Sequence, residues 1–383
     1  MSPNLPKRVP RRVALLSTAA VVAGLAGLAA TNAFASEAVD WTVTDTPAMD
    51  SNYSLRSTEV LADDDVWAVG YTVDQMWNGT VALHWDGKAW EQTPTPEGLA
   101  LTDVSAANSD DVWAVGVNDA GGMTARWDGS KWTEVPSPPP DVPAGQKPAL
   151  NGVDYAQSGG EAWAVGCASN EDHSKQTAFA QHWDADGSEW KLTELPVPDG
   201  VTDTCLESVE IRSATEAWAV GRAAGSDSGA AYILRWDGEA WSVVEGPDIG
   251  KPDAHLTSVI APAVGMEAAQ IYAAGFAKDK FGDFLDGQPI LFTWDGKKWT
   301  SVETPETTGW VYGIGPDGAG GVFITGYGSR GASILLRYDG STVTSETPPV
   351  QDGTSSLYGT AASPEGDVWV VGDVGDADED MKG

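Results

Sequence analysis

Three features of the sequence predict an all-β fold, and specifically a seven-bladed β-propeller of four-stranded antiparallel blades. The first is a five-residue motif that recurs seven times in 383 residues, at intervals of 46 to 55 residues. The second is an Asp-Gly pair that follows a Trp or Tyr in most copies. The third is a content of 44 Gly, 23 Pro and 18 Trp, which is typical of short strands separated by turns. No long apolar pattern with a 3.6-residue period appears, so we expect little helix.

The segment before the repeats, residues 1–35, has the features of a signal peptide. It carries four basic residues and no acidic one, then an apolar stretch at 13–30, and it ends in Ala33-Phe34-Ala35. A membrane anchor is the alternative, because the apolar stretch is near the minimum spanning length. Its Ala and Gly content and the small residues at its end favour cleavage. The general secretory route is favoured over the twin-arginine route, because the residues around Arg11-Arg12 differ from the usual pattern. We therefore expect a secreted protein with no membrane insertion.

The net charge of the chain excludes some classes of binding partner. The sequence has 22 basic and 56 acidic residues, a net charge of −34, which becomes −38 when the four leader cations are removed. Such a charge repels nucleic acids and anionic membranes and keeps an exported protein soluble. We expect no nucleic-acid partner. The leader and the Ala/Gly/Asp-rich body suggest a high-GC Gram-positive source.

Each repeat is interpreted as four strands. The motif marks the second strand, at residues 66–70, 112–116, 162–166, 217–221, 271–275, 322–326 and 368–372. A segment led by an aliphatic residue about eleven positions earlier marks the first strand, and a small residue two positions after that aliphatic suits a crowded place near the axis. A third strand ends in Trp-Asp-Gly or a variant, and another aromatic opens the fourth. The Asp-Gly pair predicts a hairpin turn, because Gly tolerates positive φ.

The two ends of the repeat array are expected to meet in one blade. Residues 41–47 resemble the fourth-strand segments of other repeats, so this segment should complete the last blade, in a propeller that spans 36–375. After Gly372 no third strand ending in Trp-Asp-Gly follows, and 376–383 is an acidic tail. Three interpretations stay open: a three-stranded blade, an abbreviated strand in the tail, or a strand supplied by a partner.

The repeat resembles a kelch-type blade. The resemblance rests on the Val/Ile-aromatic-Ala-Val-Gly segment, the Trp-Asp after it and the Trp a few residues later, and it covers about residues 40–375. Kelch blades usually carry a Gly-Gly pair, whereas each copy here has a single Gly. The resemblance implies a propeller of the kind found in scaffolds, lectins and oxidase domains, and it does not assign a function.

The two cysteines are expected to pair. Cys167 ends a second strand and Cys205 precedes the next first strand, which places both on one face of neighbouring blades. Export provides an oxidising environment. We therefore predict a Cys167–Cys205 disulfide rather than two free thiols.

Catalytic motifs are not evident. The four histidines form no metal or nucleophile motif, and two of them, His84 and His182, occupy equivalent repeat positions. No set of residues matches a galactose-oxidase copper site or a sialidase arginine triad. Carboxylates are abundant, so an acid pair for glycosidase or lyase chemistry stays open.

Binding residues are expected in the loops that differ between repeats. Aromatic residues with polar neighbours suit stacking against sugar rings, although local loop packing is the alternative for each of them. The candidates are Tyr53, Tyr71, Trp77, Phe276, Phe281, Phe284, Trp310 and Tyr327. No cofactor is required, but calcium is a possibility at Asp279, Asp283 and Asp286, whose alternative is a group of solvated carboxylates.

The sequence thus predicts a secreted, non-enzymatic, lectin-like propeller for cell-surface or environmental glycans. By analogy of fold and source alone, such a protein could be the targeting subunit of a larger secreted antibacterial toxin complex. A polysaccharide lyase or glycosidase and a protein-interaction scaffold are the alternatives.

Overall fold

The structure is a computed structural model that describes residues 11–14, 41–49, 51–73, 79–156, 160–225, 228–261, 270–280, 287–348 and 354–375. Within these ranges the regular secondary structure is β-strand, and the only helical element is a single 3-10 turn, η1 (Ser329–Gly331). No helix in the described ranges is long and apolar enough to cross a membrane. The expected all-β class is confirmed.

Consecutive strands form antiparallel sheets of four in the first part of the chain. The first three sheets follow the chain order and are built as follows: β3 (Tyr53–Ala62), β4 (Asp65–Thr72), β5 (Thr80–Trp85) and β6 (Trp90–Gln92); β7 (Ala100–Asn108), β8 (Asp111–Asn118), β9 (Gly121–Trp127) and β10 (Trp132–Val135); β11 (Lys147–Tyr155), β12 (Ala162–Ser169), β13 (Gln176–Asp184) and β14 (Glu189–Thr193).

The next eight strands belong to one sheet in which the four-strand order occurs twice. Its two halves meet in a single parallel pair, Gly229 opposite Asp253. The strands of this sheet are β15 (Asp203–Ser213), β16 (Glu216–Ala224), β17 (Gly229–Trp236), β18 (Trp241–Val243), β19 (Asp253–Ile260), β20 (Ile271–Lys278), β21 (Gln288–Trp294) and β22 (Trp299–Val302). A further four-stranded sheet has β23 (Gly309–Pro316), β24 (Val322–Gly328), β25 (Ser333–Tyr338) and β26 (Val343–Ser345).

The last sheet joins the two ends of the described chain. Its order is β2 (Trp41–Thr44), β1 (Arg11–Ala14), β28 (Val368–Gly375) and β27 (Thr354–Ala362). β2 therefore lies in the sheet that the sequence predicted for it, at the outer edge. The third position holds β1, which comes from the predicted signal peptide, an arrangement that the sequence did not suggest.

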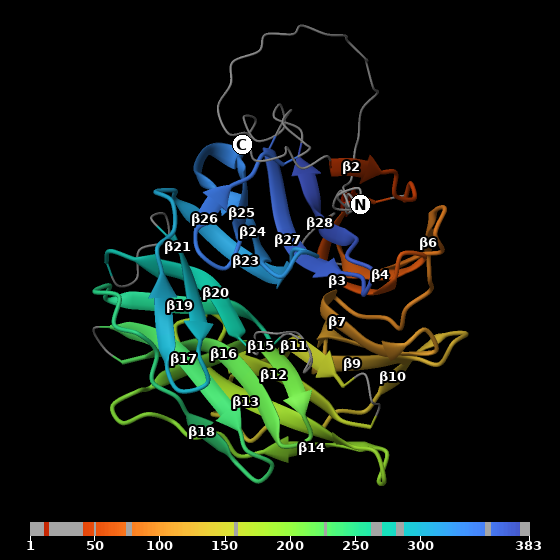
Figure 1. Ribbon diagram of the computed structural model, residues 1–383. Coiled ribbons are helices and arrows are strands. Elements are labelled where there is room, and N and C mark those ends of the chain that lie inside the picture. Colours follow the sequence, from red (N-terminus) through yellow and green to blue (C-terminus); the bar gives the residue numbers. More distant parts are fainter. Residues whose placement is uncertain are drawn as a thin grey trace, which may run out of the picture.

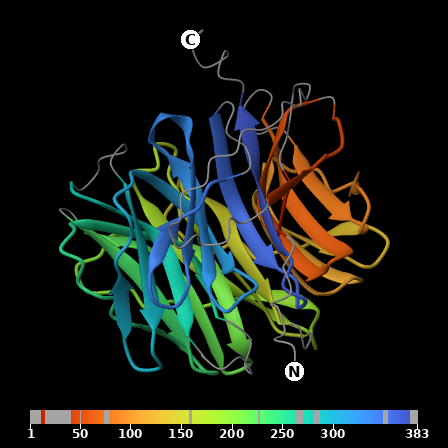
Figure 2. The same ribbon diagram turned by 45° about the horizontal axis from the view of Figure 1, so that its top comes forward.

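The sheets are arranged radially, with their first strands innermost around a central channel (Figure 1). Each first strand contacts the next first strand along the chain, and the last one contacts the first, which closes the ring. These strands are β3, β7, β11, β15, β19, β23 and β27. The turned view shows the strands of each sheet running steeply between two faces, with the connecting loops on both (Figure 2).

Buried tryptophans pack each sheet against the next. The ring centroid of the motif residue Trp67 lies 5.1 Å from that of Trp127 and 5.3 Å from that of Trp132, both in the following sheet. The same arrangement closes the ring, because Trp369 of the last sheet lies 5.4 Å and 5.3 Å from Trp85 and Trp90 of the first. Tilted and edge-to-face pairs of this kind contribute about 0.5–1.5 kcal/mol each beyond their buried area. The repeated tryptophans therefore pack between neighbouring sheets.

The Asp-Gly pairs form the hairpins between third and fourth strands. At Asp86-Gly87 the glycine has φ of 87°, and the Asp86 carboxylate accepts hydrogen bonds from the backbone amides of Lys88 and Ala89. These bonds lower the pKa of Asp86. The pair is therefore structural, as the sequence predicted.

Candidate functional site: the mouth of the central channel

A β-bulge at one place in every first strand aims a side chain at the channel. The register between first and second strands shifts just after the leading aliphatic residue, for example between Leu55 and Ser57. The skipped residue has no partner on the second strand, as in bulges generally; in β27 the ladder skips both Tyr358 and Gly359. The seven residues at this place are Arg56, Thr102, Asn151, Glu207, Thr257, Tyr312 and Tyr358. All seven line the channel, which encloses about 580 Å³.

One side of the channel is aromatic and cationic. The guanidinium carbon of Arg56 lies 3.7 Å from the ring centroid of Tyr358 and 5.4 Å from that of Tyr312. The Tyr312 and Tyr358 rings lie 4.8 Å apart, and Tyr71 is 5.7 Å from the same guanidinium carbon. We call Arg56, Tyr71, Tyr312, Tyr327 and Tyr358 the mouth cluster; each is partly exposed.

Two tyrosines of the mouth cluster, Tyr312 and Tyr358, have a raised pKa and act as neutral hydrogen-bonding groups. Burial raises the pKa of Tyr358 to about 12, although the Arg56 charge opposes this rise. Burial also raises the pKa of Tyr312, an effect to which Tyr71, Tyr327 and Asp373 add smaller contributions. Asp373 is held nearby, since its carboxylate accepts a 2.8 Å hydrogen bond from the Ser54 hydroxyl.

Arg56 is a cation without a carboxylate partner among the described residues. Other arginines, such as Arg126, are held by carboxylates, in that case Asp111 at 2.6 Å. Arg56 instead stacks on tyrosine rings, a contact that leaves guanidinium N–H groups able to donate to a ligand. The mouth cluster therefore combines flat apolar faces with hydroxyl and guanidinium donors.

A second part of the channel, which we call the acidic side, is lined by carboxylates that lie one to three residues beyond the bulge on their first strands. They are Glu59, Asp103, Asp154 and Glu210. Burial raises the pKa of Glu59 to about 8 and that of Asp103 to about 6, and the charges of neighbouring carboxylates add to both shifts. The pKa values of Asp154 and Glu210 are raised by burial as well.

Three of these carboxylates fasten neighbouring first strands together. Asp103 accepts hydrogen bonds from the Ser57 hydroxyl at 2.6 Å and from the Val153 amide at 2.9 Å, on the sheets before and after its own. Asp154 accepts from the Ser105 hydroxyl and the Ile211 amide in the same way. Glu210 accepts from the Ala261 amide at 3.1 Å. These contacts give the acidic side a structural role.

An aromatic band continues from the mouth cluster over the same face. Trp310 lies opposite Tyr327 in the ladder, and its ring is 4.8 Å from Phe276. Phe276 lies 5.0 Å from the His255 ring, and His255 Nε2 is 3.1 Å from a Glu207 carboxylate oxygen. Phe276 is only 2% exposed, so its ring supports Trp310 from beneath.

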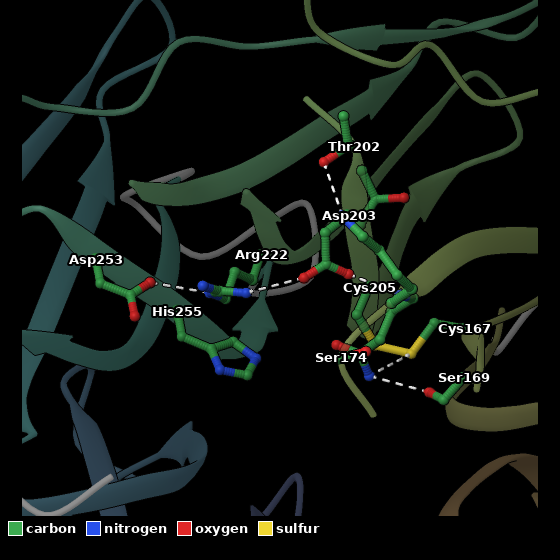
Figure 3. Close-up of polar contacts among 12 residues, drawn as sticks. Cys167, Ser169, Ser174, Thr202, Asp203, Cys205, Arg222, Asp253 and His255 are labelled. Atoms are coloured by element: carbon green, nitrogen blue, oxygen red, sulfur yellow. Dashed lines mark hydrogen bonds and ion pairs between the residues drawn. A yellow bond between two sulfur atoms is a disulfide. The ribbon is translucent and has the colours of Figure 1, made fainter. Parts of the chain in front are cut away.

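A disulfide and an ion-pair chain fix the next part of this face (Figure 3). Cys167 and Cys205 form the predicted disulfide, with their Cα atoms 4.9 Å apart. Arg222 bridges Asp203 at 3.3 Å and Asp253 at 2.9 Å. Together these contacts connect the sheet of β12 with both halves of the eight-stranded sheet.

The predicted ligand-binding aromatic residues do not form one group in the structure. Tyr71 and Tyr327 belong to the mouth cluster, and Trp310 lies beside it. Tyr53 is 1% exposed and its hydroxyl donates to the Pro47 carbonyl at 2.9 Å, so its ring is part of the core. Trp77, Phe281 and Phe284 lie outside the described residues.

The predicted calcium ligands are only partly described. Asp279 is exposed and forms an ion pair with Lys251, and Asp283 and Asp286 lie outside the described residues. Within the described ranges no group of three or more His, Cys, Asp or Glu side chains is placed to hold a metal ion.

The sequence reasoning missed Arg56, Tyr312 and Tyr358. The signal was present in the repeat, because the residue between the leading aliphatic and the small residue changes in chemistry from copy to copy while its neighbours stay similar. The bulge that turns this residue toward the channel is a backbone feature, and the pattern alone did not reveal it.

Comparisons with known proteins identify the fold and leave the family open. No family model matches the chain, and no curated protein matches it. Among solved structures, YCF48 from Cyanidioschyzon merolae matches 86% of this chain and 95% of its own, with a TM-score of 0.53 and 14% identity. A structure titled YCF48 bound to D1 peptide matches 88% and 94%, with a TM-score of 0.52 and 14% identity.

Two further matches belong to other classes of protein. The WD40 beta propeller domain of Doa1 has a TM-score of 0.50 and 12% identity over 85% of this chain and 91% of its own. The GH74 enzyme of Niastella koreensis has a TM-score of 0.52 and 14% identity over 78% of this chain and 46% of its own. At these identities the comparisons show a β-propeller fold and nothing about activity.

Proposed function

We propose that the protein is a secreted, non-enzymatic, carbohydrate-binding β-propeller whose mouth cluster holds a glycan. The observation that supports this most is the stack of Arg56 on Tyr358 beside Tyr312, at a channel mouth where no described carboxylate forms an ion pair with Arg56. A sugar ring presents an apolar face, which suits stacking on tyrosine, and a rim of hydroxyl groups, which suits guanidinium and phenol donors.

The proposal includes seven blades. The eight-stranded sheet then consists of two blades, β15–β18 and β19–β22, whose strand pairing with each other is limited to Gly229 and Asp253 among the described residues. The repeated four-strand order and the succession of first strands around the channel support this number. The kelch-like type and the actinobacterial source remain predictions from the sequence.

A non-enzymatic role is favoured by the state of the channel carboxylates. Asp103, Asp154 and Glu210 are engaged in hydrogen bonds to neighbouring strands. A glycosidase needs two carboxyl groups free to act on one bond, as acid and as base or nucleophile. The mouth cluster lies next to these carboxylates along the channel, and binding of a glycan there requires no such pair of carboxyl groups.

The test is a glycan array probed with residues 36–383, with calcium present, followed by titration of the best glycan. We expect saturable binding that weakens at least about tenfold in Arg56→Ala and in Tyr358→Ala, since each change removes a direct contact. Thr257→Ala is the matched control, because Thr257 occupies the same bulge position on another part of the channel. Calorimetric melting of each variant verifies that the fold is retained.

Absence of binding to every glycan on the array would refute the carbohydrate proposal. Equal losses in Thr257→Ala and Arg56→Ala would remove the mouth cluster as the site. Release of reducing ends or unsaturated sugars from a polysaccharide panel would replace the binding role with an enzymatic one.

The wider role that we propose is targeting within a secreted assembly, such as an antibacterial toxin complex. A rigid ring with a binding face at one mouth suits delivery of other subunits to a cell surface. Co-purification of further subunits with the protein from culture supernatant supports this role, and a protein that is recovered alone contradicts it.

A further inference from the structure

The last sheet has a third strand that differs in direction from those of the other sheets. In every other described sheet, the third strand is antiparallel to the second and to the fourth. β1 instead runs parallel to both β28 and β2, with Val13 opposite Val370 on one side and Val43 on the other. A segment of the predicted signal peptide thus fills the place of a regular third strand.

β2 is held in the ring without any direct ladder to β28. Within the described residues its strand pairing is to β1 alone. Side chains of the neighbouring sheets fix it on both sides: the Trp41 ring lies 5.5 Å from Phe323, and Trp90 Nε1 donates to the Thr44 hydroxyl at 3.1 Å. β2 and β28 therefore stand about 10 Å apart, twice the strand spacing, with a slot one strand wide between them.

Removal of residues 1–35 would empty this slot. β28 would then present an unpaired edge whose residues Val368 to Val371 are fully buried in the structure, and β2 would lose its ladder. Unpaired backbone groups at such an edge favour pairing with another strand. The cleavage that we predict for export would therefore create a site for strand addition.

We propose that the chain without its leader accepts, between β28 and β2, a short β-strand donated by another polypeptide. The third strand of the neighbouring first sheet, β5, is apolar on both faces at its centre, where Val81, Ala82 and Leu83 are all fully buried. The donated strand should therefore have a short apolar core. It should also carry basic residues next to that core, because the receiving chain has a net charge of −38 without its leader cations.

The acidic end of the chain is a poor occupant of the slot. Residues 376–380 read Asp-Ala-Asp-Glu-Asp, and carboxylates are costly to bury without partners. Strand β1 meets both requirements of the proposed occupant, because its sequence is Arg-Arg-Val-Ala. Its presence in the slot supplies a probe of known sequence.

The test uses the chain 36–383 and a labelled peptide of residues 8–17, with binding followed by fluorescence anisotropy. We expect saturable binding that a Val13→Pro peptide weakens at least tenfold, because proline removes a ladder donor at the centre of the strand. A peptide with Arg11→Glu and Arg12→Glu should also bind more weakly. The full chain 1–383 is the matched protein control and should bind the peptide at least tenfold more weakly, since β1 occupies the slot.

Hydrogen exchange locates the binding. In the peptide-free chain 36–383, amides of β2 should exchange faster than those of the equivalent strand β22, and the peptide should slow them. Equal binding of the normal and Val13→Pro peptides, no binding, or amides of β2 already as slow as those of β22 without peptide would each overturn the proposal. Arg56→Ala should leave peptide binding unchanged, so this test fails or succeeds independently of glycan binding.

Discussion

At the scale of single residues, the channel carries two chemistries, one at the backbone bulge and one further along the first strands. Arg56, Tyr312 and Tyr358 form a stacked cationic and aromatic side, and the carboxylates beyond the bulge form an acidic side. The acidic side carries an electrostatic cost, because several carboxyl groups share one partly enclosed space. Because this cost arises when the carboxyl groups ionise, the stability of the folded protein should depend on pH.

Replacement of Glu59 by Gln should remove part of this dependence. A carboxyl whose pKa rises to about 8 in the folded chain holds its proton where the unfolded chain has lost it. Stability therefore falls as pH rises between about 5 and 8, and the raised pKa of Asp103, about 6, acts in the same direction. We expect Glu59→Gln to raise the melting temperature at pH 8 and leave it nearly unchanged at pH 4.

The control for this measurement is Glu91→Gln, which alters an exposed carboxylate on β6. Its melting temperature should follow that of the parent chain at every pH. A melting temperature of Glu59→Gln that parallels the parent chain from pH 4 to 8 would show that Glu59 ionises normally in the folded protein.

The sequence could predict the framework residues because their roles follow from the repeat itself. Positive φ at Gly87 and the packing of Trp67 on the next sheet both correspond to positions that recur in each copy. The binding residues were harder to predict. Tyr71 and Tyr327 were anticipated as loop aromatics, whereas Tyr53 was also named but has its ring in the core, since exposure depends on the neighbouring sheet.

At the scale of elements, the disulfide is the one covalent link between sheets in the described chain. It joins the end of β12 to the start of β15 across 38 residues of sequence. It lies on the same face as the ion-pair chain through Arg222 (Figure 3). The two features together hold neighbouring sheets at the face where the aromatic band lies.

Removal of the disulfide should destabilise the protein. In the chain-entropy model, a loop of this length stabilises the folded state by about 3 to 4 kcal/mol. We expect the double variant Cys167→Ser, Cys205→Ser to have a lower urea midpoint than the oxidised parent chain, with a similar slope. A reducing agent should lower the midpoint of the parent chain and leave that of the double variant unchanged. Identical midpoints for the oxidised parent and the double variant would contradict this expectation.

The third strand of the last sheet is a feature that the sequence pattern did not predict. The sequence indicated that this position had no regular strand, and it left three interpretations open: no third strand, a short strand in the tail, or a strand from a partner. It did not indicate that residues 11–14 would take the place, because their local pattern belongs to a signal peptide. Strand pairing between distant segments depends on which edges are left open, and a single segment does not contain that information.

At the scale of the whole molecule, the ring of sheets is a common framework, and the residues at one of its faces differ from sheet to sheet. Aromatic contacts between successive sheets return from Trp369 to Trp85 and Trp90, so the position of each bulge residue is fixed by the sheets on both sides. The mouth cluster draws on β3, β4, β23, β24 and β27, which come from the first sheet and the last two. A ligand at this mouth would therefore contact segments far apart in the sequence.

The most direct test of the central proposal is to map where a bound glycan lies. The chain 36–383 would be irradiated with a photoreactive form of the best array glycan, and the labelled peptides identified by mass spectrometry. We expect labels in 54–73, 309–328 and 354–375, which free glycan competes away and which Arg56→Ala reduces. Labels confined to the other end of the channel, or to segments away from it, would show that the mouth cluster is not the binding site.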